Sequence, residues 1–121
     1  MRKLENKIVY SSGDLVRFSR SPWASWMARF QLEGGTVQRD AADDEAQLFY
    51  EQGLKHEHAF LAALEAEGHS VTKISSPSIA DTRRQTEAAL QAKAPVVYQA
   101  YLEAGVFAGY ADFLVFDKHT Q

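Results

Sequence analysis

The chain has 121 residues, of which 45% are hydrophobic and 24% charged, and this length and balance are typical of one soluble globular domain. The formal net charge of -3 gives no overall attraction to nucleic acid, so phosphate binding would have to come from a local patch or a metal ion. The absence of cysteine excludes disulfides, thiolate metal sites and a cysteine nucleophile, and there is neither a long uncharged apolar run nor an apolar N-terminal signal core. We expect a cytoplasmic protein that does not span a membrane.

Two short helices are predicted near the N-terminus, after residues 7–10, which fit a short strand or an ordered arm. Residues 11–14 supply helix-capping side chains, and Ser21 followed by Pro22 repeats the signal, because serine is a favoured cap and proline is tolerated in the first turn. Residues 34–35, both glycine, then end the second helix, and residues 36–44 are predicted to form a loop.

The second helix carries an apolar stripe at helical spacing, formed by Trp23, Trp26, Met27 and Phe30. We expect this stripe to lie in the core, because tryptophans at such spacing usually do. The alternative is a surface that stacks bases and binds phosphates of single strands, made by the two tryptophans together with Arg17, Arg20 and Arg29.

Residues 43–67 are predicted to form the longest helix. Its apolar face contains Leu48, Phe49, Phe60, Leu61 and Leu64. His56 and Glu57 lie in line with apolar positions, so both are predicted to point toward the core side. His69 and His119 are expected to be isolated and solvated.

The C-terminal part is predicted to contain a short strand at residues 71–74, a helix at 78–92 and a β-hairpin. If Ala104 and Gly105 are the two residues of the hairpin loop, Gln99 lies opposite Tyr110 and diagonally adjacent to Asp112 on the same face.

Asp112 is a lone carboxylate in an apolar strand, and burying such a group without a partner is costly. One interpretation joins it to Glu57, with His56 as a further ligand, around a Mg²⁺ or Mn²⁺ ion. The other is that Glu57 pairs with an arginine, Asp112 caps a turn and His56 is a satisfied, half-buried histidine.

Three segments in this order carry a family resemblance: GLKHE at 53–57, VYQA at 97–100 and FAGYADFL at 107–114. Together they resemble the RecB-like nucleases of the PD-(D/E)XK superfamily. The segment RFSRSPWASWMAR at 17–29 also resembles the N-terminal segment of a bacterial branch of that family. The similarity spans nearly the whole chain, and the order of the motifs is more specific than any one of them.

The resemblance implies an α/β fold, a restriction-endonuclease-like core in which a helix is followed by a mixed sheet, and cleavage of DNA phosphodiesters that depends on Mg²⁺ or Mn²⁺. His56 and Glu57 correspond to the first acidic motif and its neighbouring histidine, Asp112 to the aspartate of the second motif, and Gln99 to a glutamine beside the site. Residues 1–42 would be a helical N-terminal elaboration and 43–121 a partial nuclease core. The implied partners are DNA, as single strands or ends, and a helicase protein or fused helicase domain.

One family motif has no counterpart after Asp112: an acidic residue, one spacer and a lysine on the next strand. Asp117 and Lys118 are adjacent and would point to opposite faces of a strand. We therefore expect a fragment that precedes the third motif, with weak metal binding and little or no nuclease activity, in preference to a degenerate relative. The alternative is a noncatalytic module that binds DNA or a protein, and an in-frame D/E-x-K motif beyond codon 121 would argue against it.

Overall fold

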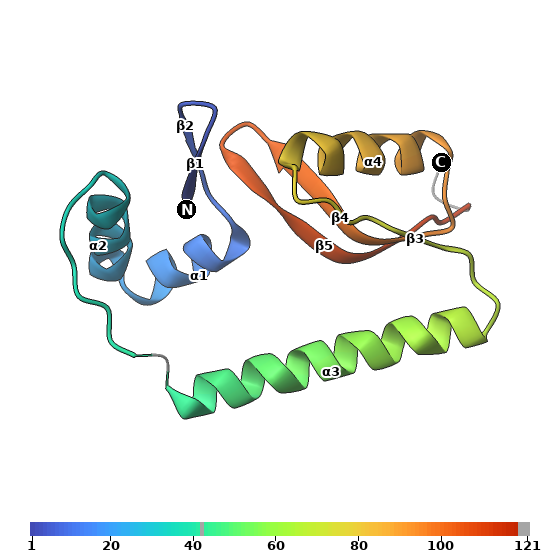
Figure 1. The fold of residues 1–121 in the computed structure, drawn as a ribbon, viewed down its shortest axis with the longest axis horizontal. Helices are drawn as coiled ribbons and strands as arrows, with labels where there is room; N and C mark the ends of the chain where they lie inside the picture. The colour runs from blue at the N-terminus through green and yellow to red at the C-terminus, as the bar shows by residue number, and fades with distance from the viewer. Residues whose placement is uncertain (42, 119–121) are drawn as a thin grey trace. The chain divides into compact units, whose positions relative to one another are not determined.

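The fold is described from a computed structural model that covers residues 1–41 and 43–118, and the predicted solvated position of His119 lies outside these residues. Within them the chain is a mixed α/β protein with four helices and two small sheets (Figure 1). In chain order its elements are β1 (Arg2–Leu4), β2 (Lys7–Val9), α1 (Ser12–Arg20), α2 (Pro22–Leu32), α3 (Asp44–Ala66), β3 (Val71–Lys73), α4 (Ile79–Gln91), β4 (Val96–Ala104) and β5 (Phe107–Val115).

The chain divides into two compact units. The first contains Met1–Asp40 together with Leu102–Gly109, and the second contains Ala41–Tyr101 and the chain from Tyr110 onward. The β4–β5 hairpin therefore contributes its tip to the first unit and its base to the second.

The first unit begins with an antiparallel hairpin of β1 and β2, in which Arg2 pairs with Val9 and Leu4 with Lys7. The two residues between the strands, Glu5 and Asn6, both have positive φ, as the favoured two-residue hairpin turns require. The predicted short strand is thus β2, and β1 was not predicted.

The caps of α1 and α2 are confirmed. Ser11 and Asp14 form a reciprocal capping box at α1, and the Ser21 hydroxyl accepts a hydrogen bond of 3.1 Å from the Ala24 N–H, with Pro22 in the first turn of α2. After α2, Gly34 has a φ of 100°, which is the left-handed conformation that glycine adopts at helix ends.

The prediction that the apolar stripe of α2 lies in the core is wrong for its three aromatic residues, whereas Met27 is half-buried. Trp23 is 68% exposed, Trp26 54% and Phe30 42%. The helix instead turns Ala24 and Ala28 toward a hollow of about 440 Å³ that Arg17 also lines. Periodicity identifies an apolar stripe but does not identify what covers it.

The hairpin tip belongs to the first unit because it pairs with the segment after β2. Tyr10 forms a parallel bridge with Phe107, in which its N–H donates to the Val106 carbonyl at 2.8 Å. The Ala108 N–H donates in turn to the Tyr10 carbonyl at 2.9 Å.

The second unit contains the larger sheet, in the order β3–β4–β5, with β3 and β4 parallel. Helix α4 connects these two parallel strands and contributes to the core through Ala89, while the Thr86 hydroxyl accepts a 3.0 Å hydrogen bond from the Tyr101 N–H. The core cluster and the apolar residues packed against it are Ile74, Ala89, Val97, Ala100, Ala94, Ala111 and Leu114.

Helix α3 is confirmed within one residue at each end, but none of its residues is buried. Of the predicted core-facing positions, Leu61 and Leu64 are half-buried, whereas Leu48, Phe49 and Phe60 are exposed, so this face is covered only in part. Within the described residues, no helix has the length and apolar character needed to cross a membrane.

The hairpin loop is one residue later than predicted, at Gly105 and Val106, and Gly105 supplies the positive φ at its first position. Counting back from this loop sets Gln99 opposite Asp112, in place of the predicted Tyr110. The hydrogen bond from the Phe116 N–H to the Pro95 carbonyl, 2.9 Å long, fits the same register.

Strand β4 is irregular at Gln99, which has a φ of 58°. Regular alternation would set Val97 and Ala100 on opposite faces, yet both lie in the core beside α4. The left-handed residue between them turns the strand, so that Tyr98 and Gln99 both reach α3.

Candidate functional site

Glu57 is held by two donors from β4. The Tyr98 hydroxyl donates to Glu57 Oε1 at 2.6 Å, and the Gln99 side-chain amide donates to the same oxygen at 2.7 Å. Glu57 is half-buried, as expected for a helix position that faces the sheet. The prediction that Glu57 points toward the core side is confirmed, and neither of these donors is the arginine that the alternative interpretation required.

Asp112 is exposed on β5, which corrects the expectation that the strand buries it, and it is reached by the same amide. Gln99 Nε2 donates to Asp112 Oδ1 at 3.2 Å, so one nitrogen lies within 3.2 Å of an oxygen of each carboxylate. Asp112 lies inside a strand and does not cap a turn. The predicted proximity of Glu57, Gln99 and Asp112 is therefore found in the structure.

The hydrogen bond to Glu57 also favours the protonated form of Tyr98. This bond raises the pKa of Tyr98, and burial and the nearby negative charges of Glu57 and Asp112 act in the same direction. The phenol therefore remains a neutral donor across the physiological range, and it orients the carboxylate without adding charge to the site.

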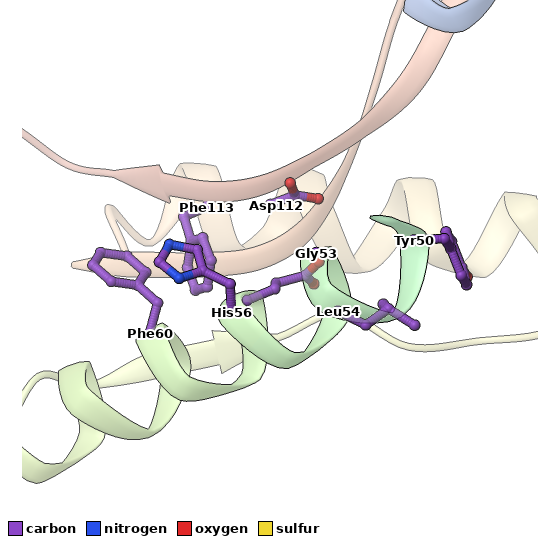
Figure 2. Close-up of a pocket in the computed structure, with 8 residues that line it drawn as sticks. Tyr50, Gly53, Leu54, His56, Phe60, Asp112 and Phe113 are labelled. Carbon is purple, nitrogen blue, oxygen red and sulfur yellow. The ribbon is translucent and has the colours of Figure 1, made fainter. Parts of the chain in front are cut away.

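A cavity of about 520 Å³ opens beside the carboxylates, between α3 and β5 (Figure 2). Phe60 and Phe113 meet edge to face on its wall at 4.9 Å between ring centroids, and the Tyr98 ring lies 5.2 Å from that of Phe113. The lining residues are Tyr50, Gly53, Leu54, His56, Glu57, Phe60, Asp112 and Phe113. The two carboxylates thus lie in a largely apolar hollow.

Gly53 is an exposed residue on the α3 side of the cavity. A Cβ atom built at Gly53 meets no other atom within 4 Å, so a side chain at this position would extend into free space beside the cavity. The glycine of the GLKHE segment is therefore not required by steric contact at this position.

His56 lines the same cavity as Glu57 and Asp112, but it is exposed and not buried (Figure 2). Consecutive residues on an α-helix differ by about 100° in direction, so the turn that aims Glu57 at β4 leads His56 away from it. In the described part of the chain, no three His, Cys, Asp or Glu side chains form a group able to hold a metal ion. His56 is thus not gathered with Glu57 and Asp112 into a three-ligand site.

The donor chemistry of the two carboxylates still fits a hard divalent cation. Mg²⁺ is commonly held by one or two carboxylates, with water and substrate oxygens completing its octahedron. Within the described residues, hydrogen bonds engage one oxygen of Glu57 and one of Asp112 and leave the second oxygen of each carboxylate available.

Tyr98 and the aromatic wall were not identified as site residues from the sequence. In a regular strand, neighbouring residues point to opposite faces of the sheet. If Gln99 faces the site, its neighbour Tyr98 is therefore expected to point away from it. Both side chains can reach Glu57 because Gln99 has a positive φ, and no residue of the VYQA segment is of a type that predicts this conformation.

No protein-family model, curated protein or solved structure matches this chain. Function is therefore inferred from the contacts of Glu57, Gln99 and Asp112 and from the order of the motifs that contain them.

Proposed function

We propose that the second unit is part of a metal-dependent deoxyribonuclease centre with a restriction-endonuclease-like PD-(D/E)XK core. Glu57 and Asp112 would hold Mg²⁺ or Mn²⁺, and His56 would lie at the edge of the site. The observation that carries this proposal is the double contact of Gln99, whose amide nitrogen bonds both carboxylates. Two carboxylates that share one donor are close enough to act on one ligand.

The residues of the site would have distinct tasks. Tyr98 and Gln99 hold Glu57 Oε1 in place, so its orientation is fixed before any ligand arrives. Phe60 and Phe113 form an aromatic wall on one side of the cavity. A bound ion would lower the pKa of a coordinated water molecule and would stabilise negative charge on a phosphodiester.

The charge of the cavity favours a cationic ligand as the first to bind. Its lining contains the carboxylates of Glu57 and Asp112 and neither lysine nor arginine. A phosphodiester alone would meet two negative charges there, which is unfavourable at short range. A divalent cation reverses that sign, which is why we propose a metal ion and not a direct phosphate site.

The proposed substrate is DNA, as single strands or ends, with water as the nucleophile and no covalent enzyme intermediate. A helicase protein or a fused helicase domain is the proposed partner. The competing proposal is a noncatalytic module that binds DNA or a protein, and the exposed aromatic residues of α2 favour it.

Calorimetric titration with Mn²⁺ tests the metal site. We expect Glu57→Ala and Asp112→Ala each to weaken binding at least about tenfold, because each removes a charged ligand. Glu51→Ala is the matched control, since Glu51 is an exposed carboxylate of the same helix that does not line the cavity. Mn²⁺ binding that is unchanged in both test variants would overturn the proposal and leave the noncatalytic module as the better account.

His56→Ala decides the role of the histidine in the same titration. If His56 stays outside the coordination sphere, Mn²⁺ affinity changes less than threefold. A loss as large as that of Asp112→Ala would show that α3 adjusts to bring the imidazole to the ion.

A further inference from the structure

Helix α2 of the first unit exposes its largest apolar side chains, although such side chains usually lie in the core. Its small residues Ala24 and Ala28 face the hollow that Arg17 lines, while Trp23 and Trp26 are mostly exposed. Burying a large aromatic side chain contributes roughly 1.5–3 kcal/mol to stability, so this arrangement leaves a substantial folding contribution unused. Packing within the unit does not explain why the helix carries its largest rings outside.

The exposed rings form an ordered stack. The centroids of Trp23 and Trp26 are 5.1 Å apart with an angle of 20° between the ring planes, and those of Trp26 and Phe30 are 5.5 Å apart with an angle of 8°. The three rings are nearly parallel and pack on one another, and the Phe30 ring lies against Gly35, so an incoming base would extend this stack at its Trp23 end or insert into it. We call these three residues the aromatic platform.

The charge around the aromatic platform is positive. From Asp14 to Glu33 the chain contains three arginines and two acidic residues, and these two pair with Arg17 and Arg29, so the net charge of the segment is +1. Arg20 directly precedes the cap of α2, is exposed, and has no ion pair or hydrogen-bond partner among the described residues. Arg29 lies one turn after Trp26 and is partly compensated by Glu33 at 2.8 Å.

The two units also differ in net charge. The first unit contains seven lysines and arginines against five acidic residues, for a net charge of +2, whereas the second contains six against eleven, for a net charge of -5. The overall charge of -3 therefore conceals a basic unit that can attract a polyanion.

We propose that the aromatic platform stacks the bases of single-stranded DNA, with Arg20 and Arg29 beside its phosphates. Aromatic faces bind any unpaired base, and nearby cations follow the backbone, which is how proteins bind single strands without sequence preference. A duplex would not serve, because its bases are already stacked on one another. The choice of DNA rests on the proposed nuclease function, whereas the stacking and the charge are features of the first unit alone.

The only two tryptophans of the chain both belong to the aromatic platform, so intrinsic fluorescence reports on this surface directly. Titration with a thymidine oligonucleotide in EDTA should quench that fluorescence. We expect Trp26→Ala to weaken binding about tenfold or more, measured by anisotropy of a labelled oligonucleotide, because removal of the central ring breaks the stack on which bases would pack. Trp26→Tyr should restore most of the affinity, which separates loss of stacking from misfolding.

Phe49→Ala is the matched control, since Phe49 is an equally exposed aromatic residue on α3 of the second unit, and it should leave DNA affinity unchanged. Equal affinity for an abasic oligonucleotide would overturn the proposal, because phosphate contacts alone would then account for binding. Sedimentation that shows a dimer without DNA, converted to monomer by Trp26→Ala, would also overturn it and would identify a second copy of the chain as the occupant.

The two proposals fail separately. If only the platform proposal is wrong, Mn²⁺ binding persists and still depends on Glu57 and Asp112, while the fluorescence is not quenched. If only the metal site is wrong, Asp112→Ala has no effect on Mn²⁺ binding, while single-stranded DNA still quenches the tryptophans in EDTA.

Discussion

Tyr98 is the closest partner of Glu57, and its hydroxyl can be removed with little change of shape. Tyr98→Phe should lower the free energy of unfolding by about 1 kcal/mol at neutral pH, because a hydrogen bond to a charged acceptor is lost. Urea unfolding followed by far-UV circular dichroism measures this. Tyr50→Phe is the control, because Tyr50 is mostly exposed and should change stability by less than about 0.5 kcal/mol.

The same tyrosine makes stability depend on alkaline pH. The pKa of Tyr98 is raised above the ordinary value of 10.0, so the folded state keeps its proton after the unfolded state has lost it. This contribution to stability is fully present below pH 10.0 and is lost as pH rises toward the folded pKa. Unfolding at a series of pH values should show a steeper alkaline decline in the wild type than in Tyr98→Phe, and equal slopes would contradict the assignment.

Gln99 combines a functional contact with an unfavourable backbone conformation. A non-glycine residue with positive φ costs about 1 kcal/mol, which glycine avoids. Gln99→Ala and Gln99→Gly both remove the amide that joins Glu57 to Asp112, but only glycine also relieves the backbone. We therefore expect the glycine variant to be the more stable of the two by about 1 kcal/mol in urea unfolding. Equal stabilities would show that the backbone at this position stores no strain.

At the level of elements, the capping box of α1 joins Ser11, Asp14, Arg17 and the N-terminal ammonium group. Burial raises the pKa of Asp14, but hydrogen bonds from the N-terminal ammonium group and from Ser11 outweigh this effect, so its pKa lies well below the usual range. The carboxylate also accepts a hydrogen bond from Arg17 at 2.8 Å. Asp14 therefore contributes stability as an anion.

Asp14→Asn should destabilise the first unit by about 2 kcal/mol at pH 7, because it removes a buried charge from charged donors. Since the folded pKa is depressed, this contribution is present above the ordinary pKa of 3.8 and is lost as pH falls below it. The difference between wild type and variant, measured by urea unfolding with tryptophan fluorescence, should therefore shrink in acid. Asp40→Asn, an exposed change in the same unit, should have little effect at any pH.

How well an element could be predicted depended on how local its signal is. The caps at Ser11 and Ser21 were predictable, because a helix cap depends only on residues within about four positions of each other. The direction of Glu57 was predictable from helical period, but its partner Tyr98 lies 41 positions away and reaches it only through the distortion at Gln99. The prediction that the aromatic stripe of α2 is buried was wrong for a related reason. Helical periodicity identifies which residues share a face of the helix, but it does not identify what packs against that face.

At the level of the whole molecule, the division into two units could not be read along the chain, because residues 102–109 join the first unit across a long separation. That connection depends on main-chain hydrogen bonds of Tyr10 with Val106 and Ala108. Neither hydrogen bond involves a side chain, so no pattern of residue types predicts this connection. The first unit is therefore complete only when the hairpin tip is present.

Ala108→Pro tests this dependence. Proline removes the N–H that donates to the Tyr10 carbonyl at 2.9 Å, and its ring also obstructs the strand, so we expect the first unit to lose about 3 kcal/mol. Ala108→Gly keeps the donor and should cost only about 0.5–1 kcal/mol. Hydrogen exchange should show faster opening of α1 and α2 in the proline variant, with α4 largely unaffected. Equal effects of proline and glycine, or an effect confined to α4, would show that the tip is not needed to hold the first unit together.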